Sequence, residues 1–446
     1  MNTTVYALAT APGRAGVAII RLSGSAAVDI ALRLTKRKSL KPRTAHHCRF
    51  FDAAGHVIDD GLVLYFPAPH SYTGEDVVEL HCHGSPAAVK ALLAFCGAQL
   101  GCRHAEPGEF TRRALLAGKI NFSYAEGLAD LLDAETEAQR QLSRQLMDGQ
   151  QAQRFYDWSE ALRQLLALHE ALLDFSDEDL PASVPLQQRA RLETLTTEIE
   201  DYLKGAAPAQ LLRDGYRVVL TGNVNAGKSS LFNALCGRNA ALVSDIAGTT
   251  RDVLEVRLDI GGYPILLTDS AGQRDTGDTI EAMGIAKAQE ALAAAQLILW
   301  VIAAPEVPSS IPLSRLMPDY LCGLSVPVLA VVSKSDMAQP LPADLDRPHV
   351  LTSLYNRDSL QVLQNEILTQ LQLSGDAAAT LSAVSARQQD ALQKTVLHLC
   401  EALSETDAAL AAESLRHAWR CCQSLYGEAD SDRVLDDVFS RFCIGK

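Results

Sequence analysis

The chain has 446 residues, of which 48% are apolar and 21% are charged, a composition typical of a folded globular protein and not of a disordered one. At this length about two to four domains are expected. The formal net charge of −14 argues against a broadly basic surface, so any contact with RNA would need a local basic patch or a basic partner.

No targeting or membrane segment is expected. The first residues, "MNTTVYALATAPG", lack the basic start of a signal peptide. The longest apolar run, residues 291–304, contains Gln296 and is too short to cross a membrane. The ten cysteines form no C-x-x-C pair, which indicates free thiols in a reducing cytoplasm. We therefore expect a cytoplasmic protein.

The sequence pattern changes three times along the chain. Residues 1–119 mix short apolar runs with Gly and Pro breaks, which is typical of an α+β domain. Residues 120–212 carry leucines at helical spacing and predict the first half of a helical domain. Residues 213–376 alternate helices with nearly continuous apolar strands, as in a parallel sheet buried on both faces. Helical spacing returns over 377–446, so we predict an α/β domain inserted into one helical domain.

A phosphate-binding loop is predicted at the start of the α/β domain. The segment "GNVNAGKS" (222–229) follows an apolar strand, opens a helix and fits G-x-x-x-x-G-K-S. Gly222 and Gly227 let backbone N–H groups face the phosphates. Lys228 offers a positive charge to the β- and γ-phosphates, and Ser229 offers a hydroxyl to Mg²⁺.

Two further segments predict that the base is guanine. "SKSD" (333–336) follows a predicted strand, where GTPases carry N-K-x-D. Asp336 can accept from N1–H and the 2-amino group of guanine, whereas adenine offers neither donor. Ser333 stands in place of the usual Asn, so the contact of that side chain is weakened or lost. "TSL" (352–354) falls where another base-contacting loop belongs. These segments predict a GTPase and not an ATPase.

Other segments carry a resemblance to one family. "APGRAGVAIIRLSG", "SYTGEDVVELHCHG", "GEFTRRALLAGKINFSYAEGLADL", "SDIAGTTRD" and the final "FCIGK" resemble the tRNA modification GTPase MnmE (TrmE) family over essentially the whole chain. The resemblance implies an N-terminal tetrahydrofolate-binding and dimerising domain, a helical domain, and an inserted Ras-like G domain. It also implies a homodimer that works with the flavoprotein MnmG in a heterotetramer or larger complex. Its expected activity is potassium-activated GTP hydrolysis coupled to addition of a carboxymethylaminomethyl or aminomethyl group at C5 of the wobble uridine of certain tRNAs.

The resemblance also implies cofactor sites. Arg21, Glu79, Lys119 and Lys446 fall where the family binds 5,10-methylenetetrahydrofolate or a related reduced folate. The residues implied for GTP, K⁺ and Mg²⁺ are, in chain order, Asn225, Ala226, Gly227, Lys228, Ser229, Ser230, Ser244, Asp245, Ile246, Ala247, Gly248, Thr249, Thr250, Asp269, Ser270, Ala271, Gly272, Ser333, Lys334, Ser335, Asp336, Thr352, Ser353 and Leu354.

Two cations are expected in the nucleotide site. Asn225, Ser244, Ile246 and Thr249 fall where the family coordinates K⁺, while Ser229 and Thr250 would complete the Mg²⁺ shell. A fixed cation between the β- and γ-phosphates can replace an arginine finger, because negative charge develops there during hydrolysis. Asn225 could instead hydrogen-bond within its own loop, as Asn does in turns.

Two side chains compete to orient the attacking water. "DSAG" (269–272) fits D-x-x-G, with Asp269 near Mg²⁺ and the Gly272 N–H near the γ-phosphate. Gln273 follows where Ras-type GTPases place their water-orienting Gln. Glu281 matches the glutamate that the family uses for this role, and we favour it.

The C-terminal segment has two interpretations. Cys443 is fourth from the end, as in a C-a-a-X prenylation signal. However, Gly445 and Lys446 do not fit that signal, and the preceding segment is acidic and would be repelled by anionic lipid. A tail that delivers Cys443 and Lys446 to the folate site fits the resemblance better, and whether the thiol is catalytic stays open.

Two residue clusters and one alternative function stay open. His81 and His83 would share a strand face, as two ligands of a metal ion could. Because no second cluster stands at ligand spacing, we favour their interpretation as core or folate-pocket residues. Arg112, Arg113 and Lys119 are either a solvated helix face or a contact for an anion or RNA. The alternative function is a ribosome-assembly GTPase of the Era or Der kind, although no KH-type motif or second phosphate loop is visible.

Overall fold

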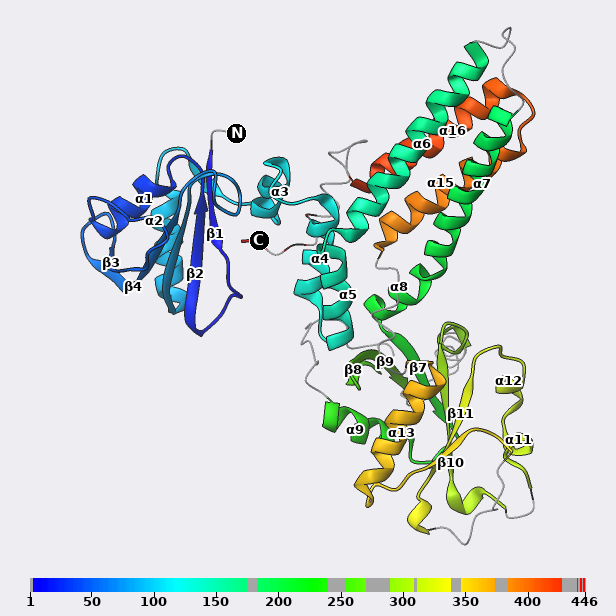
Figure 1. The fold of residues 1–446 in the computed structure, drawn as a ribbon. Helices are drawn as coiled ribbons and strands as arrows, with labels where there is room; N and C mark the ends of the chain where they lie inside the picture. The colour runs from blue at the N-terminus through cyan, green and yellow to red at the C-terminus, as the bar shows by residue number, and fades with distance from the viewer. Residues whose placement is uncertain are drawn as a thin grey trace, which may run out of the picture. The chain divides into compact units, whose positions relative to one another are not determined.

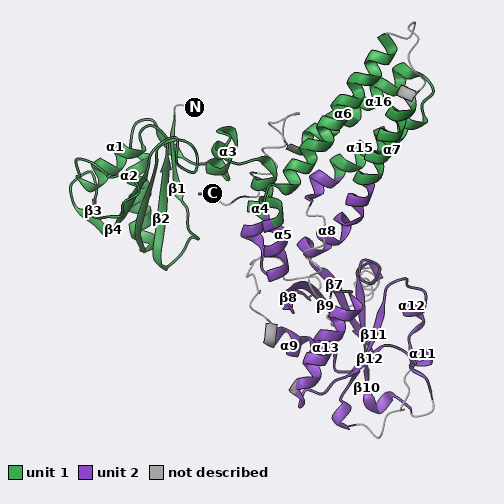
Figure 2. Ribbon diagram, in the orientation of Figure 1, with its two compact units in different colours: residues 1–129, 145–199, 390–446 green, residues 130–144, 200–389 purple. Residues whose placement is uncertain are grey.

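The structure, a computed structural model, describes residues 3–174, 183–239, 254–269, 289–308, 311–337, 346–373, 384–426, 439, 442 and 444–445. The chain divides into two compact units, each made of segments that are distant in sequence (Figure 2). Unit 1 comprises residues 1–129, 145–199 and 390–446, and unit 2 comprises residues 130–144 and 200–389.

Unit 1 begins with a six-stranded sheet in the order β3-β4-β5-β2-β1-β6 (Figure 1). Its strands are β1 (Thr4–Leu8), β2 (Ala15–Ser23), β3 (His46–Phe51), β4 (Val57–Phe66), β5 (Val77–Gly84) and β6 (Cys102–His104). In β2, Ala18, Ile20 and Leu22 are buried, because alternate strand residues point to one face of a sheet. Helices α1 (Ala27–Thr35) and α2 (Pro86–Gly97) supply the rest of this core.

The opposite face of this sheet is partly covered by α3 (Glu109–Leu116). Phe110 of α3 packs with Val5 and Ala7 of β1 and with Tyr72 from the loop before β5. Arg21 of β2, on this same face, therefore lies among aromatic side chains.

The remaining part of unit 1 is helical. The helices of the helical region are α4 (Phe122–Asp133), α5 (Glu137–Met147), α6 (Gln150–Asp174), α7 (Ser183–Lys204), α15 (Ala386–Ser404) and α16 (Ala408–Gln423), followed by the short η3 (Ser424–Tyr426). Most of α5 belongs to unit 2, as do the ends of α4 and α7 and the start of α15. α16 returns to α6, where Arg416 pairs with Glu170 and the Cys422 thiol donates to the Phe155 carbonyl. Chain segments on both sides of the α/β region thus share one helical bundle.

Unit 2 contains a second six-stranded sheet in the order β12-β11-β10-β7-β9-β8. Its strands are β7 (Tyr216–Gly222), β8 (Leu254–Ile260), β9 (Tyr263–Asp269), β10 (Leu297–Ala303), β11 (Val328–Ser333) and β12 (His349–Leu351). β8 pairs antiparallel with β9, and the other described pairs are parallel. Every residue of β9 and β10 is buried, as expected for strands covered on both faces.

Helices of unit 2 include α8 (Ala206–Asp214), α9 (Lys228–Asn239), α11 (Leu313–Leu316), α12 (Asp319–Cys322) and α13 (Arg357–Gln370), with 3-10 turns η1 (Ala304–Glu306) and η2 (Ser335–Met337). The predicted fold class, an α+β domain and a helical domain with an inserted P-loop α/β domain, is confirmed. The predicted domain bounds stay a prediction.

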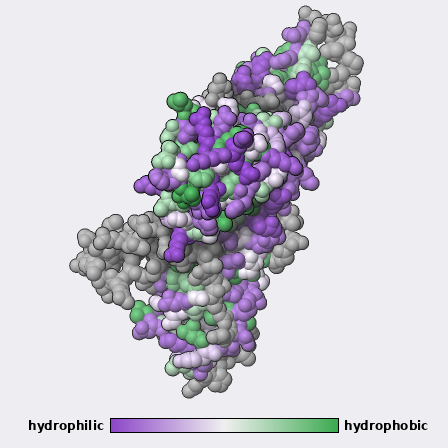
Figure 3. Space-filling view, turned by 90° about the vertical axis from the view of Figure 1, so that its left-hand side faces the viewer, coloured by the Kyte–Doolittle hydropathy of each residue, from purple (hydrophilic) through white to green (hydrophobic). Residues whose placement is uncertain are grey.

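The surface reflects the composition of the chain. On the face that Figure 3 shows, hydrophobic side chains lie interspersed among hydrophilic ones over the described residues, because polar groups are too few to cover a protein surface. Among the helices that the structure describes, none is both long and apolar enough to cross a bilayer.

Candidate functional site

The phosphate loop joins β7 to α9. Gly222, at the end of β7, has φ 143°, and a Cβ there would overlap the Val301 carbonyl of the neighbouring strand. Gly227 has φ 92°, a value that L side chains rarely adopt. Asn225 lies between them with φ 62°. Glycine at the two motif positions therefore allows the tight turn that precedes α9.

Lys228, the first residue of α9, is folded back onto this loop. Its Nζ donates to the carbonyl oxygens of Gly222 (2.8 Å) and Asn223 (2.7 Å), and the residue is 8% exposed. Burial lowers the pKa of the Lys228 ammonium, and the Asp269 carboxylate opposes this effect. Asp269 ends β9, which pairs with β7. The loop thus holds a cation beside a carboxylate, which suits a metal-bound polyphosphate.

A cavity of about 220 Å³ adjoins the phosphate loop. It lies between the start of α9, the end of β11 and the segment after β12. Among the predicted residues it brings together Gly227, Ser230, Ser333, Lys334, Asp336, Thr352, Ser353 and Leu354. The Ser353 hydroxyl donates to Asp336 Oδ1 over 2.6 Å, which holds the carboxylate in place.

Two residues of "SKSD" also support the phosphate loop. The Ser333 hydroxyl donates to the Ala226 carbonyl oxygen (2.5 Å), and Lys334 Nζ donates to that of Asn225 (2.8 Å). The predicted base and phosphate segments, about 110 residues apart in sequence, are thus neighbours in the structure. Ser335 lies in η2, beside Asp336.

Ser229, the second residue of α9, is exposed. Other predicted residues of the nucleotide site and of the tail lie outside the described residues. They are Ser244, Asp245, Ile246, Ala247, Gly248, Thr249, Thr250, Ser270, Ala271, Gly272, Gln273, Glu281, Cys443 and Lys446.

The predicted folate residues Arg21 and Glu79 are neighbours on adjacent strands. Arg21 donates from Nε (3.1 Å) and Nη2 (2.9 Å) to Glu79 Oε1. The Arg21 guanidinium carbon lies 5.6 Å from the ring centroids of both Tyr72 and Phe110. Neither aromatic residue was among the predicted site residues; strand and helix patterns do not show which rings meet a cation across a sheet.

The end of the chain lies against the same sheet. Ile444 forms an antiparallel bridge with Pro107, which precedes α3. Gly445 has φ 105°, and a Cβ there would overlap the Leu8 carbonyl. Leu8 ends β1, the strand that pairs with β2 near Arg21. Glycine at this position therefore allows the tail to approach the sheet closely.

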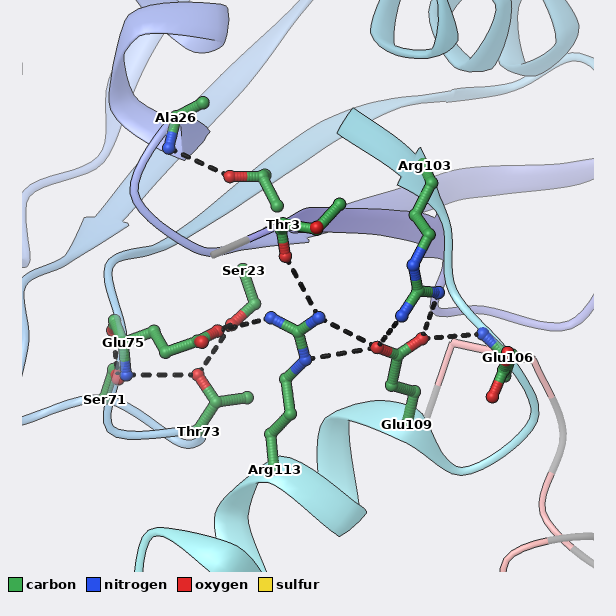
Figure 4. Close-up of polar contacts among 11 residues, drawn as sticks. Thr3, Ser23, Ala26, Ser71, Thr73, Glu75, Arg103, Glu106, Glu109 and Arg113 are labelled. Atoms are coloured by element: carbon green, nitrogen blue, oxygen red, sulfur yellow. Dashed lines mark hydrogen bonds and ion pairs between the residues drawn. The ribbon is translucent and has the colours of Figure 1, made fainter. Parts of the chain in front are cut away.

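Arg113 fits neither interpretation of the predicted basic cluster. Arg113 is 4% exposed and pairs with Glu109 (2.8 Å) and Glu75 (2.8 Å), so it is neither a solvated residue nor an exposed RNA contact. Its Nη2 also donates to the Thr3 carbonyl, and Arg103 pairs with Glu109 from the other side (Figure 4). The i,i+4 spacing of Glu109 and Arg113 on one helix was the available signal.

The two histidines of β5 have carboxylate partners. His83 Nδ1 lies 2.8 Å from Asp59 Oδ1, and His81 Nε2 lies 3.4 Å from Glu79 Oε2. The Asp59 carboxylate raises the pKa of His83. No metal-binding cluster of three or more His, Cys, Asp or Glu occurs among the described residues.

Comparison with known proteins assigns the chain to a family. Residues 4–119 match the model described as GTP-binding protein TrmE N-terminus, and residues 122–443 match the MnmE helical domain. A "tRNA modification GTPase MnmE" of Paramagnetospirillum magneticum is 42% identical, with all of both chains covered. The chain belongs to the MnmE family of tRNA modification GTPases. The resemblance and the GTPase prediction made from the motifs are thereby confirmed.

The chain is also similar to a protein from outside bacteria. A mitochondrial protein of Danio rerio, "5-taurinomethyluridine-[tRNA] synthase subunit GTPB3", is 38% identical and covers all of this chain and 93% of its own. Among solved structures, the G domain of the T. maritima FeoB iron transporter is 25% identical, with a TM-score of 0.27, and covers 35% of this chain and 98% of its own.

Proposed function

We propose that this chain is a potassium-activated GTPase that modifies the wobble uridine of certain tRNAs together with the flavoprotein MnmG. The modification adds a carboxymethylaminomethyl or aminomethyl group at C5. The enzyme acts in the cytoplasm as a homodimer, in a heterotetramer or larger complex with MnmG. Full-length similarity to tRNA modification GTPases carries the proposal, and the phosphate loop beside the cavity with Asp336 supports GTP as its nucleotide.

The residues present fit the proposed cofactors. Ser229 and Asp269 offer the hydroxyl and carboxylate oxygens that Mg²⁺ prefers, and Asn225 offers an amide oxygen to K⁺. Arg21, Glu79 and the two neighbouring rings suit an aromatic, hydrogen-bonding ligand with an anionic tail such as a reduced folate. The folate would supply a one-carbon unit, while these residues bind and orient it.

Deleting the gene and analysing cellular tRNA tests this function. Mass spectrometry should show loss of the C5 modification at the wobble uridine, and the intact gene should restore it. Unmodified wobble uridine in wild-type cells would contradict this function. Defective ribosome assembly with normal tRNA modification would instead support the Era-like alternative.

The tail is expected to contribute to folate binding. Gly445→Ala should weaken binding of a stable reduced folate about 10–100-fold, the range for losing a hydrogen bond to a charged group, because a Cβ at Gly445 would meet the Leu8 carbonyl and push this part of the tail away from the sheet. Equilibrium dialysis measures the affinity. Gly101→Ala is the matched control, since Gly101 also has a positive φ but open space around it. Deleting residues 443–446 should act like Gly445→Ala, and GTP binding should persist in both.

A prenyl adduct on Cys443 in the native protein would contradict the tail assignment. Cys443→Ser keeps the tail in place and tests the thiol separately. If this variant binds folate normally but modifies no tRNA, the thiol takes part in the chemistry.

Glu281 and Gln273 are expected to differ in hydrolysis. Glu281→Ala should slow single-turnover GTP hydrolysis on the order of 10²-fold or more, the range for a positioned acid–base group, with GTP affinity preserved. Gln273→Ala should change the rate much less. The opposite ranking would place the attacking water at the Ras-like position.

Hydrolysis is also expected to require potassium. Turnover in K⁺ should greatly exceed turnover in Na⁺, because the smaller sodium ion cannot span the same ligands. Asn225→Ala should abolish this difference with nearly unchanged GTP binding. Equal rates of the unmodified protein in the two salts would leave Asn225 as an ordinary loop residue.

A further inference from the structure

The Ser333 hydroxyl occupies a position where GTPases usually have an asparagine amide. Ser333 ends β11 and is 6% exposed. Its Oγ lies 2.5 Å from the Ala226 carbonyl oxygen and 3.3 Å from that of Ile302. A serine hydroxyl has one hydrogen, and both neighbours are acceptors. That hydrogen is therefore used within the protein.

The contact to Ala226 fixes the phosphate loop. The next residue, Lys334, donates to the neighbouring Asn225 carbonyl over 2.8 Å. Ser333 and Lys334 thus donate hydrogen bonds to two successive carbonyl groups of the phosphate loop. Ser333 is therefore a positioning residue for the segment that precedes Lys228.

Guanine offers different groups on its two edges. N7 and O6 are acceptors, so N7 needs a donor from the protein. An asparagine amide has two N–H donors and could serve both the loop and the base. The Ser333 hydroxyl, engaged with Ala226, has no second hydrogen for N7. Asp336, held by Ser353, can still accept from N1–H and the 2-amino group.

We infer that this chain reads guanine through the N1–H and 2-amino edge, with Ser333 serving the phosphate loop and giving no hydrogen bond to N7. The site therefore accepts 7-deazaguanine nucleotides as readily as GTP. The inference rests on the proposed GTPase function, whose nucleotide preference it defines.

Equilibrium binding of GTP, 7-deaza-GTP and inosine triphosphate to the full chain tests this inference. The unmodified protein should bind 7-deaza-GTP within about twofold of GTP, because no hydrogen bond is lost. Inosine triphosphate lacks the 2-amino group that faces Asp336 and should bind about 10-fold more weakly.

Two variants separate the Ser333–Ala226 contact from recognition of the guanine base. Ser333→Ala should weaken GTP and 7-deaza-GTP equally, because it removes only the contact to Ala226. Ser333→Asn should gain a preference of about 2–10-fold for GTP over 7-deaza-GTP, the range for one added hydrogen bond. If the asparagine variant does not fold, the unmodified protein and Ser333→Ala still show whether N7 is recognised.

The following results would contradict the inference about N7 or the proposed GTPase function. Binding of 7-deaza-GTP by the unmodified protein at least fivefold weaker than GTP would show that N7 is read. A Ser333→Ala variant weakened for GTP alone would do the same. If the full chain failed to bind GTP at all, the proposed GTPase function would fail together with this inference.

Discussion

Replacing Arg113 by methionine is expected to destabilise the N-terminal sheet domain by about 3–5 kcal/mol, the cost of removing one partner of a buried ion pair. Arg113 and Glu109 are 4% and 8% exposed. Burial acts to raise the pKa of Glu109, but hydrogen bonds from Arg103, the Glu106 backbone and Arg113 outweigh it and lower the pKa. Glu109 therefore stays charged at neutral pH, so removing Arg113 would leave a buried charge without one of its partners.

The position of Arg113 explains why the effect should spread through the domain. Its guanidinium joins α3 to Glu75 in the loop before β5 and to the Thr3 carbonyl beside β1 (Figure 4). Amide hydrogen exchange in β1 measures the loss locally and should accelerate on the order of 10²-fold to 4 × 10³-fold, since each 1.4 kcal/mol is about a factor of ten.

Arg163→Met is the matched control. Arg163 pairs with Glu160 one turn away on α6, but the two side chains are 53% and 34% exposed. Such exposed pairs contribute little to stability, because water and salt screen them, so exchange should hardly change. Similar effects of the two substitutions would show that the Arg113 contacts do not stabilise the fold beyond a surface pair.

Replacing Lys228 by methionine is expected to slow GTP hydrolysis by about 10²–10³-fold, the range for removing one group that stabilises developing charge. The ammonium now donates to Gly222 and Asn223 and lies within the phosphate loop. Methionine has a similar length but no charge for the β- and γ-phosphates. Single-turnover hydrolysis at saturating GTP measures the rate, and a nucleotide-binding titration measures the affinity.

Lys204→Met is the control for the loss of a positive charge. Lys204 is 76% exposed and pairs with Asp201 on α7, and it does not line the cavity beside the phosphate loop. Its hydrolysis rate should match that of the unmodified protein. A Lys228→Met variant that hydrolysed GTP normally would remove this lysine from the phosphate site.

Local sequence determined the elements whose cause is local. The apolar strand, the glycines and Lys228 of "GNVNAGKS" predict a strand, a tight turn and a helix, because backbone freedom and burial act within a few residues. The nearly continuous apolar runs of β9 and β10 likewise predict a sheet covered on both faces. The return of helical spacing after residue 376 predicted a divided helical domain, and α16 does pack on α6. Nothing in the described residues tests the roles predicted for Glu281 or Cys443.

Only the tertiary structure decided which distant side chains meet. The sequence shows Arg113 beside Arg112 as part of a basic cluster, but the fold brings it to Glu75 and buries it. Ser333 stood out as a missing asparagine, and its contact with Ala226 became visible only because β11 and the phosphate loop adjoin. The tail glycine, Gly445, reaches β1 across the whole length of the chain. Such contacts depend on how sheets and helices pack, and residue spacing carries no record of partners that far apart.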